Sequence, residues 1–121
     1  MEPAPRPFVP ARDLAQSVAF YEALGFEKLL DGDVAIFRIG SGQFILAPAP
    51  EDGGNLMMQL MVDDVSAWWA RVAVLDLPAR FGVPAPRAPA RQPWGLVVAY
   101  LVDPAGVLWH VAERRPGVSH D

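Results

Sequence analysis

The sequence predicts an α+β protein made of two βαβββ units. In each half, a short apolar strand precedes an aspartate and a run with apolar residues at helical spacing. Short apolar segments at hairpin spacing follow each run and are typical of antiparallel strands. The halves also match at one constant spacing along the chain, which indicates one supersecondary unit used twice. The matched pairs are Val9 with Leu60, Asp13 with Asp64, Leu14 with Val65 and Val18 with Trp69.

The composition limits the class of the protein and its partners. The 121 residues are enough for one ordinary domain. A composition of 52% hydrophobic and only 20% charged residues excludes a disordered chain. The absence of cysteine excludes a disulfide scaffold and thiol catalysis, and it fits a cytoplasmic location. A net charge of −4 offers no basic surface for nucleic acid, and no apolar run reaches membrane length. We therefore expect neither a nucleic-acid nor a membrane partner.

The first half begins with a strand and a capped helix. Residues 8–11 predict the strand, and Pro10 within it favours an edge position because proline cannot donate to a strand ladder. Asp13 predicts the N-cap of the helix, and Gly25 is placed to end it. Three short strands are expected next, at residues 26–30, 34–39 and 43–47.

The second half repeats this plan. Residues 56–62 predict a strand, and Asp63 and Asp64 are both candidates for the N-cap of a second helix. A loop rich in proline, alanine and arginine follows, with one short irregular strand expected near residues 85–91. The chain is interpreted as a single domain over residues 1–121, with one unit at 6–48, a linker at 48–54, the other unit at 55–114 and a tail at 115–121.

The last part of the chain combines a tryptophan loop with a hairpin. Trp94 lies on a Pro/Gly loop, and the strand at residues 96–102 is apolar enough to predict burial on both faces. Residues 103–106 read Asp-Pro-Ala-Gly, the composition of a type I turn. The strand after this turn contains His110, the only histidine before the tail. A tryptophan on such a loop suggests the edge of a ligand site.

Several of these segments resemble the vicinal-oxygen-chelate superfamily, which includes glyoxalase I, extradiol dioxygenases and bleomycin-resistance proteins. The resemblance implies a cupped mixed or antiparallel sheet with helices on its outer face. It also implies a homodimer, with possible exchange of the first strand between the chains. The Pro-Trp-Gly loop is similar to the bleomycin-resistance branch in particular. The resemblance rests on residues 9–14, 17–21, 24–26 and 62–65 and on the stretch from Gln92 to His110.

The superfamily's metal-dependent members hold an ion with one ligand from each of four strands. The corresponding positions here are Arg6, Leu46, Met57 and His110. Only His110 could bind a hard or borderline divalent ion, because arginine stays protonated, leucine has no donor atom and a thioether is a soft ligand. One ligand does not make a metal site. We expect no metal, no cofactor and no catalytic residue.

Strand alternation and the resemblance together imply an apolar ligand cavity with a few polar groups. Trp94 is a candidate contact because an indole face stacks on planar or cationic groups. His110 is expected to be a pocket wall rather than an acid or a base. The expected ligand-binding residues are Trp94, Met57, Gln59, His110, Leu46, Phe8, Arg6, Phe37 and Leu30.

These observations predict a metal-free, small-molecule binding protein that resembles the bleomycin-resistance proteins. Such a protein would sequester a planar or cationic antibiotic or metabolite in a cleft without altering it. One alternative is a metal-independent lyase or isomerase of the glyoxalase superfamily that uses His110 as its acid or base. Another is a degenerate family member that binds no ligand.

Overall fold

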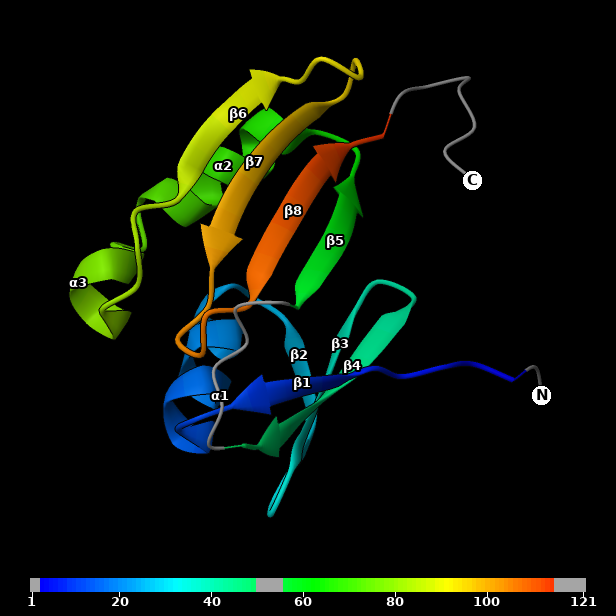
Figure 1. Cartoon of the computed structure of the whole chain (residues 1–121), viewed down its shortest axis with the longest axis vertical. Helices are drawn as coiled ribbons and strands as arrows, with labels where there is room; N and C mark the ends of the chain where they lie inside the picture. Colours follow the sequence, from blue (N-terminus) through cyan, green and yellow to red (C-terminus); the bar gives the residue numbers. More distant parts are fainter. Residues whose placement is uncertain (1–2, 50–55, 115–121) are drawn as a thin grey trace. The chain divides into compact units, whose positions relative to one another are not determined.

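The computed structural model describes residues 3–49 and 56–114 (Figure 1). These residues form two compact units, each with its own four-stranded sheet. The first unit is Met1–Leu56 with Asp103–Val107, and the second is Met57–Val102 with Leu108–Asp121. Two mixed sheets with their helices confirm the predicted α+β fold of two βαβββ units. The expected tail and most of the expected linker lie outside the described residues.

The sheet of the first unit has the strand order β1-β4-β3-β2. β1 pairs with β4 in parallel, and the other neighbours are antiparallel. β1 therefore occupies an edge, as Pro10 predicted. The strands are β1 (Phe8–Ala11), β2 (Glu27–Asp31), β3 (Ala35–Ile39) and β4 (Gly42–Pro48).

The helix of this unit, α1 (Leu14–Ala23), starts and ends where the sequence predicted. At its start, the side chain of Asp13 accepts a hydrogen bond of 3.1 Å from the backbone N–H of Gln16. At its end, Gly25 adopts a φ of 89°, which L-residues with a side chain rarely adopt.

Gly25→Ala is expected to lower the free energy of unfolding by about 1 kcal/mol, because alanine is strained at this positive φ. An added Cβ would meet no atom within 4 Å, so strain rather than a clash is the cause. Gly32→Ala is the matched control, because its surroundings are equally open and its φ lies outside the left-handed region. Urea unfolding of both variants measures the effect, and equal losses would contradict the explanation.

The core of the first unit is centred on Tyr21, which has no exposed surface. Its ring packs against Phe26, Phe37 and Phe44 with centroid distances of 5.6, 5.8 and 5.1 Å. Phe37 and Phe44 also stack on each other at 5.9 Å. The phenol of Tyr21 thus lies in an aromatic cluster and needs a hydrogen-bond partner.

That partner is Asp103, which is 2% exposed. Tyr21 Oη donates to Asp103 Oδ2 at 2.6 Å, while Asp103 Oδ1 accepts from the backbone N–H groups of Ala105 and Val107 at 2.8 and 2.9 Å. The N–H of Gly106 donates to the carbonyl of Asp103 at 3.0 Å, which confirms the predicted turn. Asp103–Val107 belongs to the compact first unit, in which Tyr21 also lies, whereas the sequence placed it in the second.

Burial raises the pKa of Asp103, and the hydrogen bonds from Tyr21 and the backbone only partly oppose the increase. A carboxyl with a raised pKa in the folded state binds its proton more readily there than in the unfolded chain. Its contribution to stability is therefore fully present below the ordinary aspartate pKa and is lost as the pH rises through the raised value.

Asp103→Asn removes this titration while its amide oxygen can still accept the two backbone hydrogen bonds. We expect the free energy of unfolding of the wild type, minus that of the variant, to increase as the pH falls from about 7 to about 4. Urea unfolding at a series of pH values measures the difference. A difference that stays constant, or that decreases with falling pH, would contradict the raised pKa.

The sheet of the second unit repeats the plan with the order β5-β8-β7-β6. β5 pairs with β8 in parallel, and β8, β7 and β6 are antiparallel neighbours. The predicted irregularity of β6 is present as a register shift between Arg87 and Ala90. The strands are β5 (Met57–Val62), β6 (Arg87–Arg91), β7 (Val97–Val102) and β8 (Leu108–Glu113).

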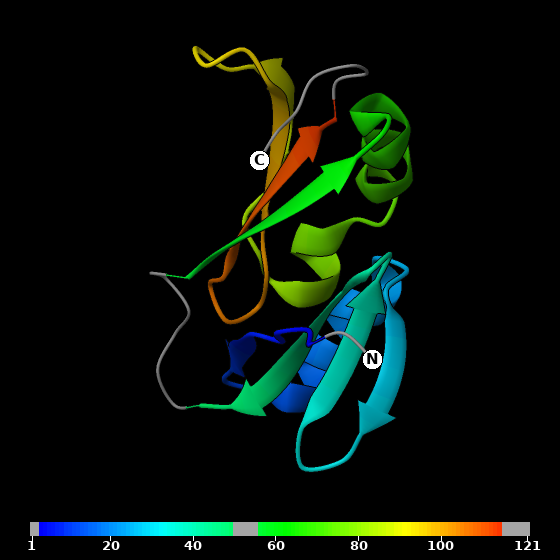
Figure 2. The same ribbon diagram turned by 90° about the vertical axis from the view of Figure 1, so that its right-hand side faces the viewer.

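The helix α2 (Val65–Ala73) covers one face of this sheet (Figure 1, Figure 2). Of the two candidate residues, Asp64 is the cap, because its side chain accepts a hydrogen bond of 3.0 Å from the N–H of Ala67. Trp109 and Val111 of β8 are buried on the covered face. Among the described residues, no helix is both long and apolar enough to cross a membrane.

The expected loop after α2 contains a short helix that the sequence did not predict, α3 (Leu77–Phe81). Asp76 and Gly82 bound it, and both adopt a positive φ, of 53° and 69°. Only Leu77 of this helix is buried, so no apolar stripe marked it in the sequence.

The prediction that β7 is buried on both faces is wrong in part. Ala99 and Leu101 are buried on the face that α2 covers, and Val98 is buried on the other. Tyr100 and Val102, which share the face opposite α2 with Val98, are only half-buried. We call the side opposite α2 the open face of the second sheet.

Candidate functional site

A row of four side chains with hydrogen-bonding groups crosses the open face of the second sheet. His110 in β8 pairs with Gln59 in β5 on one side and with Tyr100 in β7 on the other. Tyr100 in turn pairs with Arg87 in β6. Directly paired residues point to the same face, so the row runs across all four strands. Each of the four is exposed or half-buried and is therefore accessible to a ligand.

Apolar side chains lie beside this row. Met57, Leu108 and Val102 are paired across β5, β8 and β7. Each lies two residues along its strand from a member of the row, so it points to the same face. Met57 is among the most exposed large hydrophobic residues described. A face with a few polar groups among apolar ones is the usual composition of a small-molecule site.

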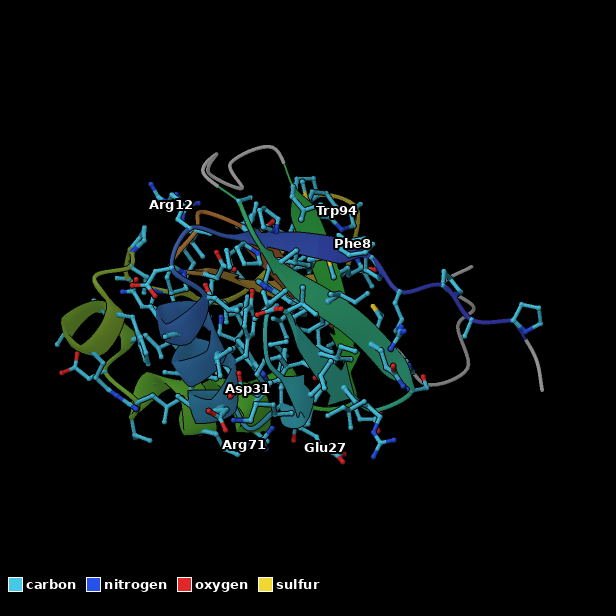
Figure 3. All side chains as sticks on the ribbon, turned by 90° about the horizontal axis from the view of Figure 1, so that it is seen from below. Phe8, Arg12, Glu27, Asp31, Arg71 and Trp94 are labelled. Carbon is cyan, nitrogen blue, oxygen red and sulfur yellow. The ribbon has the colours of Figure 1, made fainter. Side chains whose placement is uncertain are left out.

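Trp94 stands at the tip of the hairpin between β6 and β7. The N–H of Gly95 donates to the carbonyl of Gln92, and the N–H of Gln92 donates to the carbonyl of Leu96, both at 2.8 Å. Gly95 has a φ of 99°, and Pro93 precedes the tryptophan. These features define a three-residue loop of a tight turn followed by a left-handed glycine. Trp94 is held by this loop while its side chain stays 59% exposed (Figure 3).

Trp94, His110 and Tyr100 form a cluster of rings on the open face. The Trp94 and His110 rings are nearly parallel, with an interplanar angle of 3° and a centroid distance of 6.5 Å. The Tyr100 ring meets His110 edge-on at 4.6 Å. The two aromatic neighbours fix the orientation of the imidazole, and the exposed indole offers a flat surface for stacking. We call these three residues the ring cluster.

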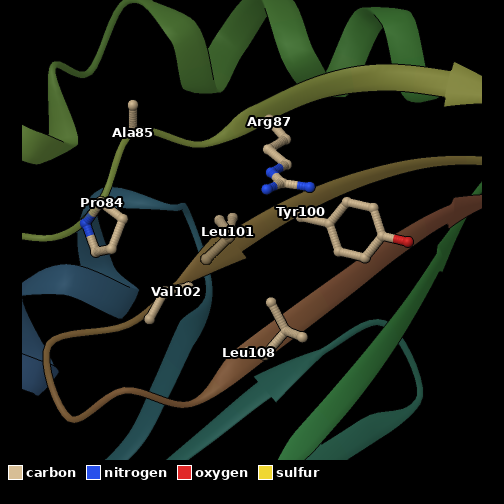
Figure 4. A pocket seen from close by; sticks show the side chains of 7 residues that line it. All are labelled: Pro84, Ala85, Arg87, Tyr100, Leu101, Val102 and Leu108. Atoms are coloured by element: carbon tan, nitrogen blue, oxygen red, sulfur yellow. The ribbon is translucent and has the colours of Figure 1, made fainter. Parts of the chain in front are cut away.

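A pocket of about 480 Å³ also opens in the second unit (Figure 4). Most of its walls are apolar, and among the described residues that line it Arg87 is the only charged one. None of the nine expected ligand-binding residues lines this pocket. Tyr100 lines it and also belongs to the ring cluster. The one feature of the sequence that could have indicated the pocket is the hydroxyl of Tyr100, since the rest of its strand is apolar. The lining residues are Pro84, Ala85, Arg87, Tyr100, Leu101, Val102 and Leu108.

Four expected site residues lie in the second unit. Gln59, His110 and Met57 are accessible on the open face, and Trp94 stacks beside His110. Their assignment as ligand contacts remains a prediction, to which the structure adds Tyr100 as a neighbour of His110.

Five expected site residues lie in the first unit, and two of them need correction. Leu46 and Phe37 have no exposed surface and belong to the core around Tyr21. In β3 and β4 the expected alternation was therefore out of phase by one residue, and the face opposite α1 carries Ile45 and Ile36 instead.

The other three residues are accessible within the first unit. Phe8 pairs with Ile45 and Leu30 pairs with Ile36, so Phe8 and Leu30 share the face opposite α1. Phe8 is 67% exposed. Arg6 precedes β1 and donates a long hydrogen bond of 3.4 Å to the side chain of Gln43. Their role in binding also remains a prediction.

Residues 5–111 match the Glyoxalase/Bleomycin resistance protein/Dioxygenase superfamily, and the chain belongs to this superfamily. A bleomycin resistance protein from Klebsiella pneumoniae is 32% identical over an alignment of 127 positions, gaps included, that covers 90% of each chain. The predicted membership and the resemblance to the bleomycin-resistance branch are confirmed.

Two similar solved structures agree with this assignment. A bleomycin-binding protein in complex with bleomycin has a TM-score of 0.81 and 28% identity, covering 94% of this chain and 100% of the other. A bleomycin resistance determinant encoded on the transposon Tn5 has a TM-score of 0.76 and 25% identity, covering 94% and 99%.

The residues at the metal positions do not fit the divalent ion of the superfamily's metal-dependent enzymes. His110 has Gln59 and Tyr100 as its neighbours across the strands, and Leu46 is in the core of the first unit. In residues 3–49 and 56–114, no three His, Cys, Asp or Glu side chains gather where they could hold a metal ion. The absence of a metal and of a cofactor remains a prediction.

Proposed function

We propose that the chain binds a planar antibiotic of the bleomycin type and holds it without altering it. The observation that most supports this function is the ring cluster. It presents an exposed indole from a rigid hairpin, parallel to the imidazole on the open face of the second sheet. The confirmed similarity to bleomycin-resistance and bleomycin-binding proteins names the class of ligand.

The geometry suits binding because little rearrangement is needed before a flat ligand stacks. Two hydrogen bonds of 2.8 Å close the loop that holds Trp94, so the entropy cost of fixing this side chain is partly met before binding. The exposed thioether of Met57 adds an adaptable apolar contact on the same face as His110. A preorganised ring with a flexible apolar neighbour favours recognition of one face of a planar group.

The surroundings of His110 give little support to acid–base chemistry. Its contacts are the rings of Trp94 and Tyr100, and no group in the described part of the chain hydrogen-bonds its imidazole. General acid–base histidines are usually oriented by a hydrogen bond to one ring nitrogen. We therefore propose that His110 is part of the binding wall.

His110→Ala is expected to weaken bleomycin binding only by about threefold to tenfold, the loss of one aromatic contact. His110→Phe keeps a ring at the position and should retain more of the affinity than alanine. Isothermal titration calorimetry measures both variants against the wild type. Turnover of the drug by the wild type that disappears in both variants would show that His110 is catalytic.

We also propose that the chain is one ligand-binding domain that works as a cytoplasmic homodimer. The superfamily resemblance supports the dimer, and so does the exposed Phe8 on the edge strand β1. The absence of cysteine supports the cytoplasmic location. Light scattering after size-exclusion chromatography tests the assembly, and a monomer at all accessible concentrations would reject it. Dimer mass in a variant that lacks residues 1–11 would argue against exchange of the first strand.

A thermal-shift screen tests the proposed function most simply. A ligand that binds only the folded chain raises its apparent stability, by about 2.7 kcal/mol at a hundredfold excess over the Kd. Bleomycin is expected to raise the melting temperature in a concentration-dependent way. No shift with bleomycin or with any other planar DNA-damaging antibiotic would support a degenerate member that binds nothing.

A further inference from the structure

The pocket beside the ring cluster has a chemistry that differs from a stacking surface. Five of its seven lining residues are apolar. The remaining two, Arg87 and Tyr100, are directly paired between β6 and β7. In Figure 4 the Arg87 side chain extends from β6 toward the side chain of Tyr100. Arg87 and Tyr100 therefore both line the pocket, and the Tyr100 hydroxyl lies at the end of its ring that points away from the guanidinium (Figure 4).

Neither polar group is satisfied within the protein. Among the described residues, no side chain or carbonyl accepts a hydrogen bond or ion pair from the Arg87 guanidinium, and the Tyr100 hydroxyl has no hydrogen-bond partner. Other arginines near strand ends differ. Arg38 donates to both carboxylate oxygens of Glu27 at 2.7 and 2.9 Å, and Arg91 donates to the carbonyl of Gly95 at 3.0 Å.

The charge in the pocket selects the sign of its ligand. None of the described lining residues is a carboxylate, so a cationic group placed beside Arg87 would be repelled by it. A carboxylate could accept the planar fork of hydrogen bonds that the guanidinium of Arg87 offers.

The size and walls of the pocket select the rest of the ligand. A volume of about 480 Å³ exceeds that of a bare inorganic anion and lies within the usual range for small-molecule sites. An inorganic ion would leave the apolar side chains of Leu108, Val102 and Pro84 exposed to water, whereas the apolar body of an organic ligand would cover them.

We propose that this pocket binds a small organic anion, in which a carboxylate lies against Arg87 and an apolar body contacts Leu108 and Val102. This subsite goes beyond the proposed function, because stacking on Trp94 requires only a planar face and places no demand on charge. If a bound antibiotic reaches both features, its cationic groups lie away from Arg87.

Four simple probes test the inference on the full chain by two-dimensional NMR of the 15N-labelled protein. They are benzoate, the neutral benzamide, the benzylammonium cation and inorganic phosphate. Benzoate is expected to shift the backbone amides of Val102 and Leu108 in a saturable way and to bind about tenfold more tightly than benzamide. Benzylammonium and phosphate are expected to bind more weakly still.

Arg87→Gln is expected to weaken benzoate about tenfold and to leave benzamide nearly unchanged. Arg71→Gln removes the same charge from α2 and should change neither probe. Unaltered benzoate affinity in Arg87→Gln, or equal affinity of the wild type for benzoate and benzamide, would overturn the inference.

The same samples separate this inference from the proposed function. Bleomycin binding without any benzoate binding would reject the anion subsite alone. Benzoate binding without any bleomycin binding would reject the proposed function and leave the subsite in place.

Discussion

Replacing Tyr21 by alanine is expected to lower the free energy of unfolding by about 3–5 kcal/mol. The side chain has no exposed surface and contacts several aromatic rings, so its removal leaves a cavity at the centre of the first unit. It also removes the 2.6 Å hydrogen bond to the buried carboxyl of Asp103. Urea unfolding followed by circular dichroism measures the loss.

Tyr21→Phe is the matched control, because it keeps the ring and removes only the hydroxyl. We expect it to cost about 1–3 kcal/mol, the usual penalty for leaving one partner of a buried hydrogen bond unsatisfied. Combining it with Asp103→Asn should give less than the sum of the single losses, because the two residues are in contact. A negligible effect of Tyr21→Phe would show that the hydrogen bond contributes little to stability.

Trp94→Ala is expected to weaken bleomycin binding by roughly 1–3 kcal/mol, on the order of a ten- to hundredfold increase in Kd. The indole is exposed and supported by a closed hairpin, so its removal should change the ligand surface more than the fold. Trp94→Phe keeps a smaller aromatic face and should recover part of the affinity. Calorimetric titration of each variant with bleomycin measures the effect.

Val74→Ala is the control for loss of an exposed hydrophobic side chain elsewhere in the second unit. It should leave the affinity for bleomycin unchanged. Equal binding by the wild type and Trp94→Ala would remove Trp94 from the site and with it the main structural support for stacking.

Local signals in the sequence predicted most of the fold. Asp13 and Asp64 each provide a side-chain cap, and Gly25 supplies a positive φ, so the helix ends follow from single residues. The turn at Asp103 is equally local, because its carboxylate accepts from N–H groups close by in the chain. Its partnership with Tyr21 spans most of the sequence, and no local pattern indicated it.

The faces of the strands were harder to predict than the strands themselves. β3 and β4 have apolar residues on both faces, so alternation alone could not decide whether Phe37 and Leu46 or Ile36 and Ile45 pack against α1. The aromatic cluster around Tyr21 decides it in favour of Phe37 and Leu46. In the second unit, the polar residues His110 and Gln59 indicated which face of β8 and β5 is the polar one.

The pocket at Arg87 was not predicted for a different reason. β6 is short, mostly exposed and irregular, so its register against β7 could not be derived from periodicity. Only the pairing of Arg87 with Tyr100 places a cation at the pocket. A site that depends on register across an irregular strand requires a structure.

The most direct test of the central claim is a calorimetric titration of the purified chain with bleomycin, followed by mass spectrometry of the drug that is recovered. We predict saturable binding of one molecule per chain and recovery of the drug with its mass unchanged. Absence of saturable heat, or recovery of a drug with an altered mass, would contradict the proposal that this protein binds its ligand and holds it unmodified.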